Sequence, residues 1–247
     1  YGTRGNVRGM TAVLKDMNAL GISLDSIGTT HVVYCYARVG DVYRAQQHME
    51  SINGEREPDL KAQSVQNVLQ AYRTALSDKS KSRLERERLL SNANELVKTT
   101  QLDSEDSQDR MIGMLMDLYA RFGSLRDVQE TFNLIKKPTA VAYGIFFKAY
   151  GNANRAEYAT ERFHRLLAEE YRPALDLSVF NTVMDSWVKS TAIDTFDSAY
   201  ELLKVVDLSV TCQKWGIRAD LYTMNCLLKC AAKPQFDFGA EKAEHIL

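Results

Sequence analysis

The sequence predicts an all-α protein, an α-solenoid of about six helix-turn-helix repeats, because one aromatic residue recurs and the text around it recurs too. The aromatics are Tyr1, Tyr36, Tyr72, Tyr119, Tyr150 and Trp187, spaced by 35, 36, 47, 31 and 37 residues. Tyr36-Ala37-Arg38-Val39-Gly40-Asp41-Val42 returns as Tyr119-Ala120-Arg121-Phe122-Gly123-Ser124-Leu125. A period in this range is typical of stacked helical hairpins, in which each repeat packs against its neighbours.

Each aromatic is expected near the end of a first helix, and an apolar stripe after it indicates a second helix. Apolar residues in steps of three, four and three lie on one helical face. The stripes are Val7, Met10, Leu14 and Met17; Val42, Ala45, Met49 and Ile52; Leu125, Val128, Phe132 and Ile135; Ala156, Ala159, Phe163 and Leu166; and Phe196, Ala199, Leu203 and Val206. Ala45, Ala159 and Ala199 leave room for a neighbouring helix, and Gly40 suits the turn between helices.

These motifs resemble the pentatricopeptide repeat over essentially the whole chain. Its aromatic-Asn opening is matched by Phe180-Asn181-Thr182-Val183-Met184-Asp185-Ser186-Trp187, and Tyr143-Gly144-Ile145-Phe146-Phe147-Lys148-Ala149-Tyr150 is a second copy. Its exit is matched by Gly21-Ile22-Ser23-Leu24-Asp25, Pro58-Asp59 and Gly216-Ile217-Arg218-Ala219-Asp220. The resemblance implies a right-handed superhelix. The tetratricopeptide repeat is the nearest rival, but it lacks this opening and this exit.

The expected organisation is one array over residues 1–247, with partial repeats at both ends. The approximate units are 1–25, 26–59, 60–108, 109–139, 140–176, 177–220 and 221–247. The long third unit carries Lys79, Lys81, Arg83, Arg86 and Arg88, which we interpret as a longer loop between helices running into a solvated helix face. A basic contact for phosphates or for an acidic protein is the alternative.

Composition favours binding over catalysis. The 247 residues carry a formal net charge of −1 and four cysteines without paired spacing, which indicates reduced thiols. We find no phosphate-binding loop and no other catalytic motif, so no enzyme activity, cofactor or small-molecule substrate is expected. The pairs His31 with Cys35 and Cys226 with Cys230 are each too few for a metal site and are expected to pack in the core.

The resemblance implies a scheme in which each repeat reads one base of single-stranded RNA. The readers in the family are the fifth residue of a repeat and its last residue. The fifth residues here are Thr30, Gln66, Gly113, Gly144, Asn181 and Asn225, and the last residues include Asp25, Asp59, Ala174 and Asp220. The pair Thr30 and Asp59 resembles a guanine reader, and Asn181 and Asp220 resemble a uracil reader. Helix capping is the alternative role for Asn181 and Asn225.

The match to that scheme is incomplete. Gly113 and Gly144 offer no side chain to a base. Of the apolar residues that flank bases in the family, Ile27 and Val141 are present, whereas Gln63, Arg110 and Ser178 depart from the pattern.

Two further features are candidates for other contacts. Arg38, Arg121, Lys189 and Lys233 stand at equivalent places near the ends of first helices, where they could follow a phosphate backbone or complement the helix dipole. Trp215, in the segment Asp207 to Trp215, is a candidate anchor for a protein partner, because tryptophan is enriched in interface hot spots. Packing onto its own second helix is the alternative.

The function implied by the resemblance is association with organellar RNA or a ribonucleoprotein, in RNA processing, stability or translation, in mitochondria or plastids. The alternative is an architectural subunit of a large organellar complex, such as the mitochondrial ribosome, that has lost base reading. The near-neutral charge weighs against strong RNA binding. The missing readers favour backbone contacts over base contacts if RNA is bound.

Overall fold

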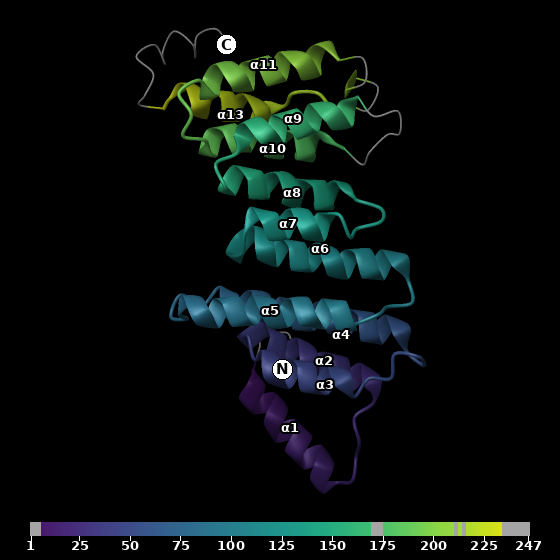
Figure 1. The fold of residues 1–247 in the computed structure, drawn as a ribbon. Coiled ribbons are helices and arrows are strands. Elements are labelled where there is room, and N and C mark those ends of the chain that lie inside the picture. Colours follow the sequence, from purple (N-terminus) through teal and green to yellow (C-terminus); the bar gives the residue numbers. More distant parts are fainter. Residues whose placement is uncertain (1–5, 169–174, 210–211, 214–215, 234–247) are drawn as a thin grey trace. The chain divides into compact units, whose positions relative to one another are not determined.

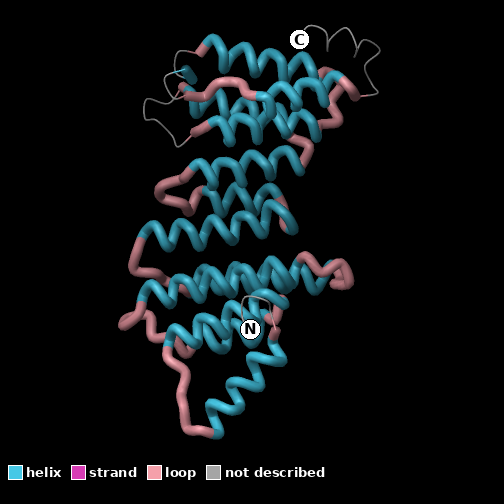
Figure 2. Tube along the Cα trace, turned by 180° about the vertical axis from the view of Figure 1, so that it is seen from behind, coloured by secondary structure: helices cyan, strands magenta, loops and turns pink. Residues whose placement is uncertain are grey.

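The computed structural model describes residues 6–168, 175–209, 212–213 and 216–233. In these ranges the chain forms twelve α-helices and no strand, which confirms the predicted all-α class (Figures 1 and 2). The helices are α1 (Val7–Ala19), α2 (Ser26–Val39), α3 (Val42–Glu50), α4 (Pro58–Leu76), α5 (Arg83–Thr99), α6 (Glu105–Phe122), α7 (Leu125–Phe132), α8 (Ala140–Asn152), α9 (Ala156–Leu167), α10 (Leu177–Lys189), α11 (Thr195–Leu208) and α13 (Leu221–Ala231). None of them is both long enough and apolar enough to cross a membrane.

The chain divides into two compact units. The first extends to Gly123 and includes Asn133–Lys136. In it the first helices α2, α4 and α6 pack side by side in chain order, while α3 lies against α2 and α4, and α5 lies against α4 and α6. The second unit holds Ser124–Phe132 and the chain from Lys137 onward. In it α8, α10 and α13 pack in the same manner, with α9 against α8 and α10, and α11 against α10 and α13.

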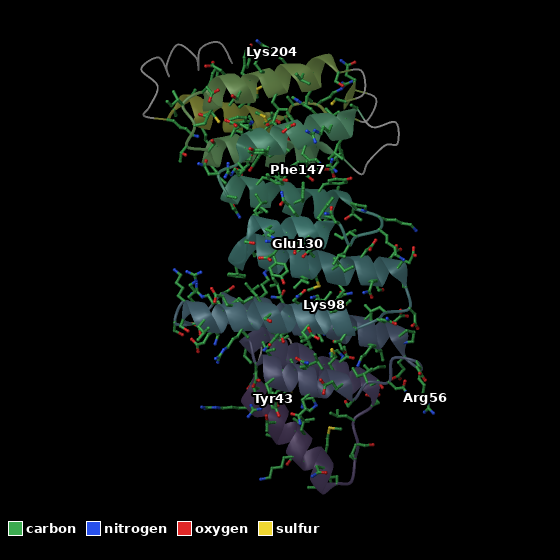
Figure 3. All side chains as sticks on the ribbon, viewed as in Figure 1. Tyr43, Arg56, Lys98, Glu130, Phe147 and Lys204 are labelled. Carbon is green, nitrogen blue, oxygen red and sulfur yellow. The ribbon has the colours of Figure 1, made fainter. Side chains whose placement is uncertain are left out.

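The residues of the predicted apolar stripes lie where the second helices pack against the first helices. Ala45, Ala159 and Ala199 have no exposed surface, and Phe163 and Val206 are also fully buried. Phe147 of α8, labelled in Figure 3, is buried, whereas Tyr43 on α3 is 77% exposed. The stripe therefore separates the packed face of a second helix from its solvated face.

Polar caps set where the first helices begin. Asp25, Thr139, Asp176 and Asp220 each accept a hydrogen bond from the backbone three residues later, at the start of α2, α8, α10 and α13. Helix α4 begins instead at Pro58, whose fixed φ suits the first helical position. At the other end of α2, Gly40 has a φ of +74°, and a Cβ there would lie 3.1 Å from the backbone nitrogen of Ala75.

The basic segment runs through the connection 77–82 into the exposed face of a helix, which agrees with the interpretation of a longer loop running into a solvated helix face. Helix α5 begins at Arg83 with a capping box between Ser82 and Glu85, and it is a complete second helix of 17 residues. Its buried residues Leu90, Ala93 and Val97 follow the same three-four stripe as the other second helices. Arg83 and Arg88 lie on its exposed face, and Arg83 pairs with Glu87 at 2.8 Å.

Candidate nucleic-acid interface

The second unit brings two predicted readers into contact. Asn181 lies in the second turn of α10 and Asp220 caps α13, and the Nδ2 of Asn181 donates to the Oδ1 of Asp220 at 3.2 Å. Asp220 also accepts from the backbone nitrogen of Thr223 at 2.9 Å. These bonds, the backbone bond first, lower the pKa of the Asp220 carboxyl, so it is ionised near neutral pH.

The capping alternative is wrong for Asn181 and Asn225. The N-caps of their helices are Asp176 and Asp220, and each asparagine is the fifth residue within its helix. Asn225 is exposed, and Asn181 is half-buried between α10 and α13. Both amides are therefore side chains of a helical face rather than backbone caps.

The first unit does not build the equivalent pair. Thr30 is 8% exposed, and its hydroxyl donates to the carbonyl of Ser26 at 2.9 Å and meets the hydroxyl of Ser64 at 3.1 Å. Asp59 lies exposed in the first turn of α4, and among the described residues no hydrogen bond joins it to Thr30. The reason is register, because Asp220 precedes Asn225 by five residues whereas Asp59 precedes Gln66 by seven.

Lys61 takes the place five residues before Gln66. Its Nζ donates to the carbonyl oxygens of Met49 and Ile52, at 3.0 and 3.4 Å, and so caps the end of α3. Burial lowers the pKa of this ammonium, and nearby Glu50 opposes that effect. Gln66 itself is half-buried on α4. Asp25, at the corresponding place before Thr30, caps α2.

The two glycines leave empty positions on their helices. A Cβ built on Gly113 of α6 or Gly144 of α8 would meet no atom within 4 Å. Val141, one turn before Gly144, is 72% exposed, and Ile27, one turn before Thr30, is 57% exposed. These apolar side chains are available to a stacked base, while the glycines supply no hydrogen bond to it.

The four basic candidates differ in what they contact. Arg121 pairs with Asp117 at 2.8 Å, and Lys189 pairs with Asp185 at 2.7 Å, each within one helix. Arg38 is exposed in the last turn of α2. Lys233 donates to the carbonyl oxygens of Trp187 and Ser190, at 2.9 and 2.5 Å, and burial lowers its pKa. Lys233 therefore caps α10, which departs from the predicted role at a phosphate.

The buried cysteines are accounted for by packing, whereas His31 is exposed, so the expectation that it packs in the core is wrong. Cys35, Cys226 and Cys230 are buried, and burial raises the pKa of Cys226 and Cys230 to about 11. No group of three potential ligands that could hold a metal occurs in the part of the chain that the structure describes. Trp215 and Ala174 lie outside the described residues.

Sequence reasoning missed Thr223 and Ser64. Thr223 has no exposed surface, and its Oγ1 donates to the Oδ1 of Asn181 at 2.6 Å. The signal was present for Thr223, because Asp220 and Thr223 have the spacing of a capping box. Nothing local in the sequence marks Ser64 as a partner of Thr30.

The comparisons with known proteins agree with this architecture. No family model matches the chain. A pentatricopeptide repeat-containing protein of Arabidopsis thaliana is 31% identical over 124 residues, which is 50% of this chain and 20% of that protein. This chain therefore spans about a fifth of the length of the curated relative it matches.

The crystal structure of the pentatricopeptide repeat protein PPR10 from maize matches the fold. Its TM-score is 0.62 at 19% identity, and the match covers 99% of this chain and 32% of the maize chain. The sequence relative covers half of this chain and the maize structure matches nearly all of its fold, so this chain has the helical-repeat fold seen in a pentatricopeptide repeat protein.

Proposed function

We propose that this chain binds single-stranded RNA along the face formed by its first helices. The observation that carries the proposal is the contact of Asn181 on α10 with Asp220 at the start of α13, with a 3.2 Å hydrogen bond. Two short polar side chains from adjacent helices present an amide and a carboxylate at one place, which suits hydrogen bonding to the edge of an unstacked base. The motif resemblance assigns this pair a preference for uracil.

The setting of that function is an organellar ribonucleoprotein, in mitochondria or plastids, acting in RNA processing, stability or translation. This setting rests on the family resemblance. The repeat boundaries that we propose are those given by the motifs, with one base expected at each repeat that carries a reader.

A second function, an architectural subunit of a large organellar complex such as the mitochondrial ribosome, is favoured by a different observation. Arg121 and Lys189 are each paired with a carboxylate, and Lys233 is turned onto α10. A basic surface whose charges are already paired attracts phosphates weakly, because fewer counterions are released on binding. In this role the surface would contact proteins, with or without the RNA backbone.

One experiment separates the two functions. The purified chain is incubated with a random library of single-stranded RNA, and the bound RNA is sequenced and then titrated by fluorescence anisotropy. RNA binding with a base preference that disappears in the Asn181→Ala, Asp220→Ala double variant supports the reader. Retention in the parent complex without RNA binding by the chain supports the architectural role and contradicts the reader.

A further inference from the structure

A buried hydroxyl holds the amide of Asn181 in one orientation. The Oγ1 of Thr223 lies 2.6 Å from the Oδ1 of Asn181 and 2.9 Å from the Oδ1 of Asp220, and the side chain has no exposed surface. On the other side of the amide, Nδ2 donates to Asp220. A flipped amide would point Oδ1 at the Asp220 carboxylate, which is unfavourable, and would remove the acceptor of the Thr223 hydroxyl. Asp220 and Thr223 together therefore favour one orientation of the amide.

The fixed amide has unused hydrogen-bonding capacity. One N–H of Nδ2 and one lone pair of Oδ1 remain after the bonds to Asp220 and Thr223. A donor and an acceptor side by side can pair with a complementary base edge, as asparagine does with adenine in DNA. The choice of base depends on which side the donor Nδ2 and the acceptor Oδ1 occupy, and hence on the orientation that Asp220 and Thr223 set together.

The same placement recurs in the first unit. Ser64 precedes Gln66 by two residues, as Thr223 precedes Asn225, and its fully buried hydroxyl meets Thr30. Other neighbouring repeats have an apolar residue in this register. Met111 holds this position in the repeat after that of Gln66, and Val179 holds it in the repeat after that of Gly144. Both side chains are fully buried. The hydroxyl thus accompanies a short polar fifth residue and is replaced by an apolar side chain where the fifth residue is glutamine or glycine.

We propose that Thr223 is a positioning residue that sets the base preference of Asn181 without touching the RNA. The inference rests on the RNA-binding function proposed above. Replacing the hydroxyl by a methyl would leave the Oδ1 of Asn181 beside an apolar group, and the amide would turn toward water to recover a partner. Affinity from stacking and phosphates would remain, while discrimination between bases would fall.

The loss-of-function test uses Thr223→Val, with Thr223→Ser to restore the hydroxyl and Thr131→Val as the matched control. Thr131 is also buried in the second unit, but its hydroxyl donates only to the carbonyl of Asp127 in its own helix. The probes are two labelled RNA oligonucleotides that differ only at the base that the wild-type chain selects from a random library. Discrimination is the ratio of their dissociation constants, and urea unfolding of each variant reports stability separately.

We expect Thr223→Val to lower this ratio about tenfold, the loss expected for one oriented hydrogen bond. The affinity for the disfavoured RNA should change by less than about threefold, because its contacts do not depend on the amide. Thr223→Ser should restore the ratio to within about twofold and Thr131→Val should leave it unchanged. An unchanged ratio in Thr223→Val would overturn the proposal, as would an equal fall in Thr131→Val.

A gain-of-function test leaves Thr223 intact and covers the case in which Thr223→Val does not fold. At the contact between α8 and α10, Asp176 already accepts from the backbone nitrogen of Val179 at 2.9 Å, as Asp220 does from Thr223. The amide and the hydroxyl are missing here, and the Oδ1 of Asp176 also accepts from the hydroxyl of Ser178 at 2.7 Å. We expect Gly144→Asn with Val179→Thr to create a preference at one additional base, at least about fivefold stronger than with Gly144→Asn alone. Equal discrimination by the single and double variants would overturn the proposal.

The outcomes also separate this inference from the proposed function. A wild-type chain that binds no RNA from the library overturns both. A wild-type chain that binds RNA without any base preference overturns the inference alone, because there is then no reader to position. A preference that survives Thr223→Val likewise leaves RNA binding standing and assigns the preference to Asn181 and Asp220 without Thr223.

Discussion

Trp187 of α10 donates a hydrogen bond from Nε1 to the Oγ1 of Thr160 of α9, at 2.9 Å, across neighbouring repeats. A contact in the same place recurs between Tyr150 of α8 and Gln129 of α7, where the Nε2 of Gln129 donates to the hydroxyl of Tyr150 at 2.8 Å. In both cases the recurring aromatic meets the fifth residue of the preceding second helix. The aromatic therefore links neighbouring repeats by a hydrogen bond, and the need for its hydroxyl or indole N–H explains why tyrosine or tryptophan occupies the position.

The first prediction tests the hydrogen bond between Trp187 and Thr160. Thr160→Val should lower the free energy of unfolding by about 1–3 kcal/mol, because it leaves the buried indole N–H without a partner. In a Trp187→Phe background the same change should cost less, since the donor is absent. Urea unfolding of the two single variants and the double variant gives the coupling energy. A coupling energy near zero would show that the bond does not stabilise the interface.

The second prediction concerns glycine. Gly113→Ala and Gly144→Ala should each raise the free energy of unfolding by about 0.5–1 kcal/mol, because both lie inside helices with open space around a Cβ. Gly151→Ala should lower it, because its Cβ would lie 3.1 Å from the Cα of Ser186 in α10. Thermal unfolding of the three variants would decide, and the explanation would be refuted by a stabilised Gly151→Ala protein.

The third prediction concerns the apolar stripe. Ala159→Asp or Ala199→Asp should destabilise by several kcal/mol, on the order of 3, because each places an unpaired charge in a contact with no exposed surface. The exposed Ala168, at the end of α9, gives the matched control, and Ala168→Asp should change stability by less than about 1 kcal/mol. Equal effects at buried and exposed sites would contradict the assigned stripe.

The fourth prediction tests the paired cations. Asp117→Asn with Asp185→Asn should release Arg121 and Lys189 and strengthen binding of all RNA sequences alike, with a steeper dependence on salt. Arg38→Ala, Arg121→Ala and Lys189→Ala together should weaken binding to all sequences and flatten that dependence. Anisotropy titrations between about 50 and 200 mM salt measure both slopes. A salt slope that is the same in both variants would exclude these residues as phosphate contacts.

The fifth prediction concerns pH. Burial lowers the pKa of His48 and His164 below the ordinary value, so the unfolded chain binds more protons than the folded chain in the range just below that value. Stability therefore falls as the pH decreases below about 6.5. Replacing both histidines with glutamine should reduce this dependence. Urea unfolding at several pH values checks it, and an unchanged pH dependence would assign the effect to other groups.

The sequence alone determined the helical repeat architecture, because periodicity is a local property of the chain. The stripe of Ala159, Phe163 and Leu166 repeats at helical spacing, and any helix that forms there must bury that face. The same reasoning applies to α5, whose stripe of Leu90, Ala93 and Val97 was not among those identified from the sequence. The repeat boundaries and the handedness of the array stay predictions from the motifs.

The candidate site depended on contacts between repeats, which only the tertiary structure decides. Asn181, Asp220 and Thr223 span 42 residues, so the sequence could name the first two by motif but could not show the hydroxyl between them. The structure also decided against Asp59 and Lys233. A shift of two residues in α4 redirected Asp59, and the carbonyl groups of Trp187 and Ser190 at the end of α10 bind Lys233. A helix face follows from spacing, but the partner of a side chain follows from which helices meet, and in what register.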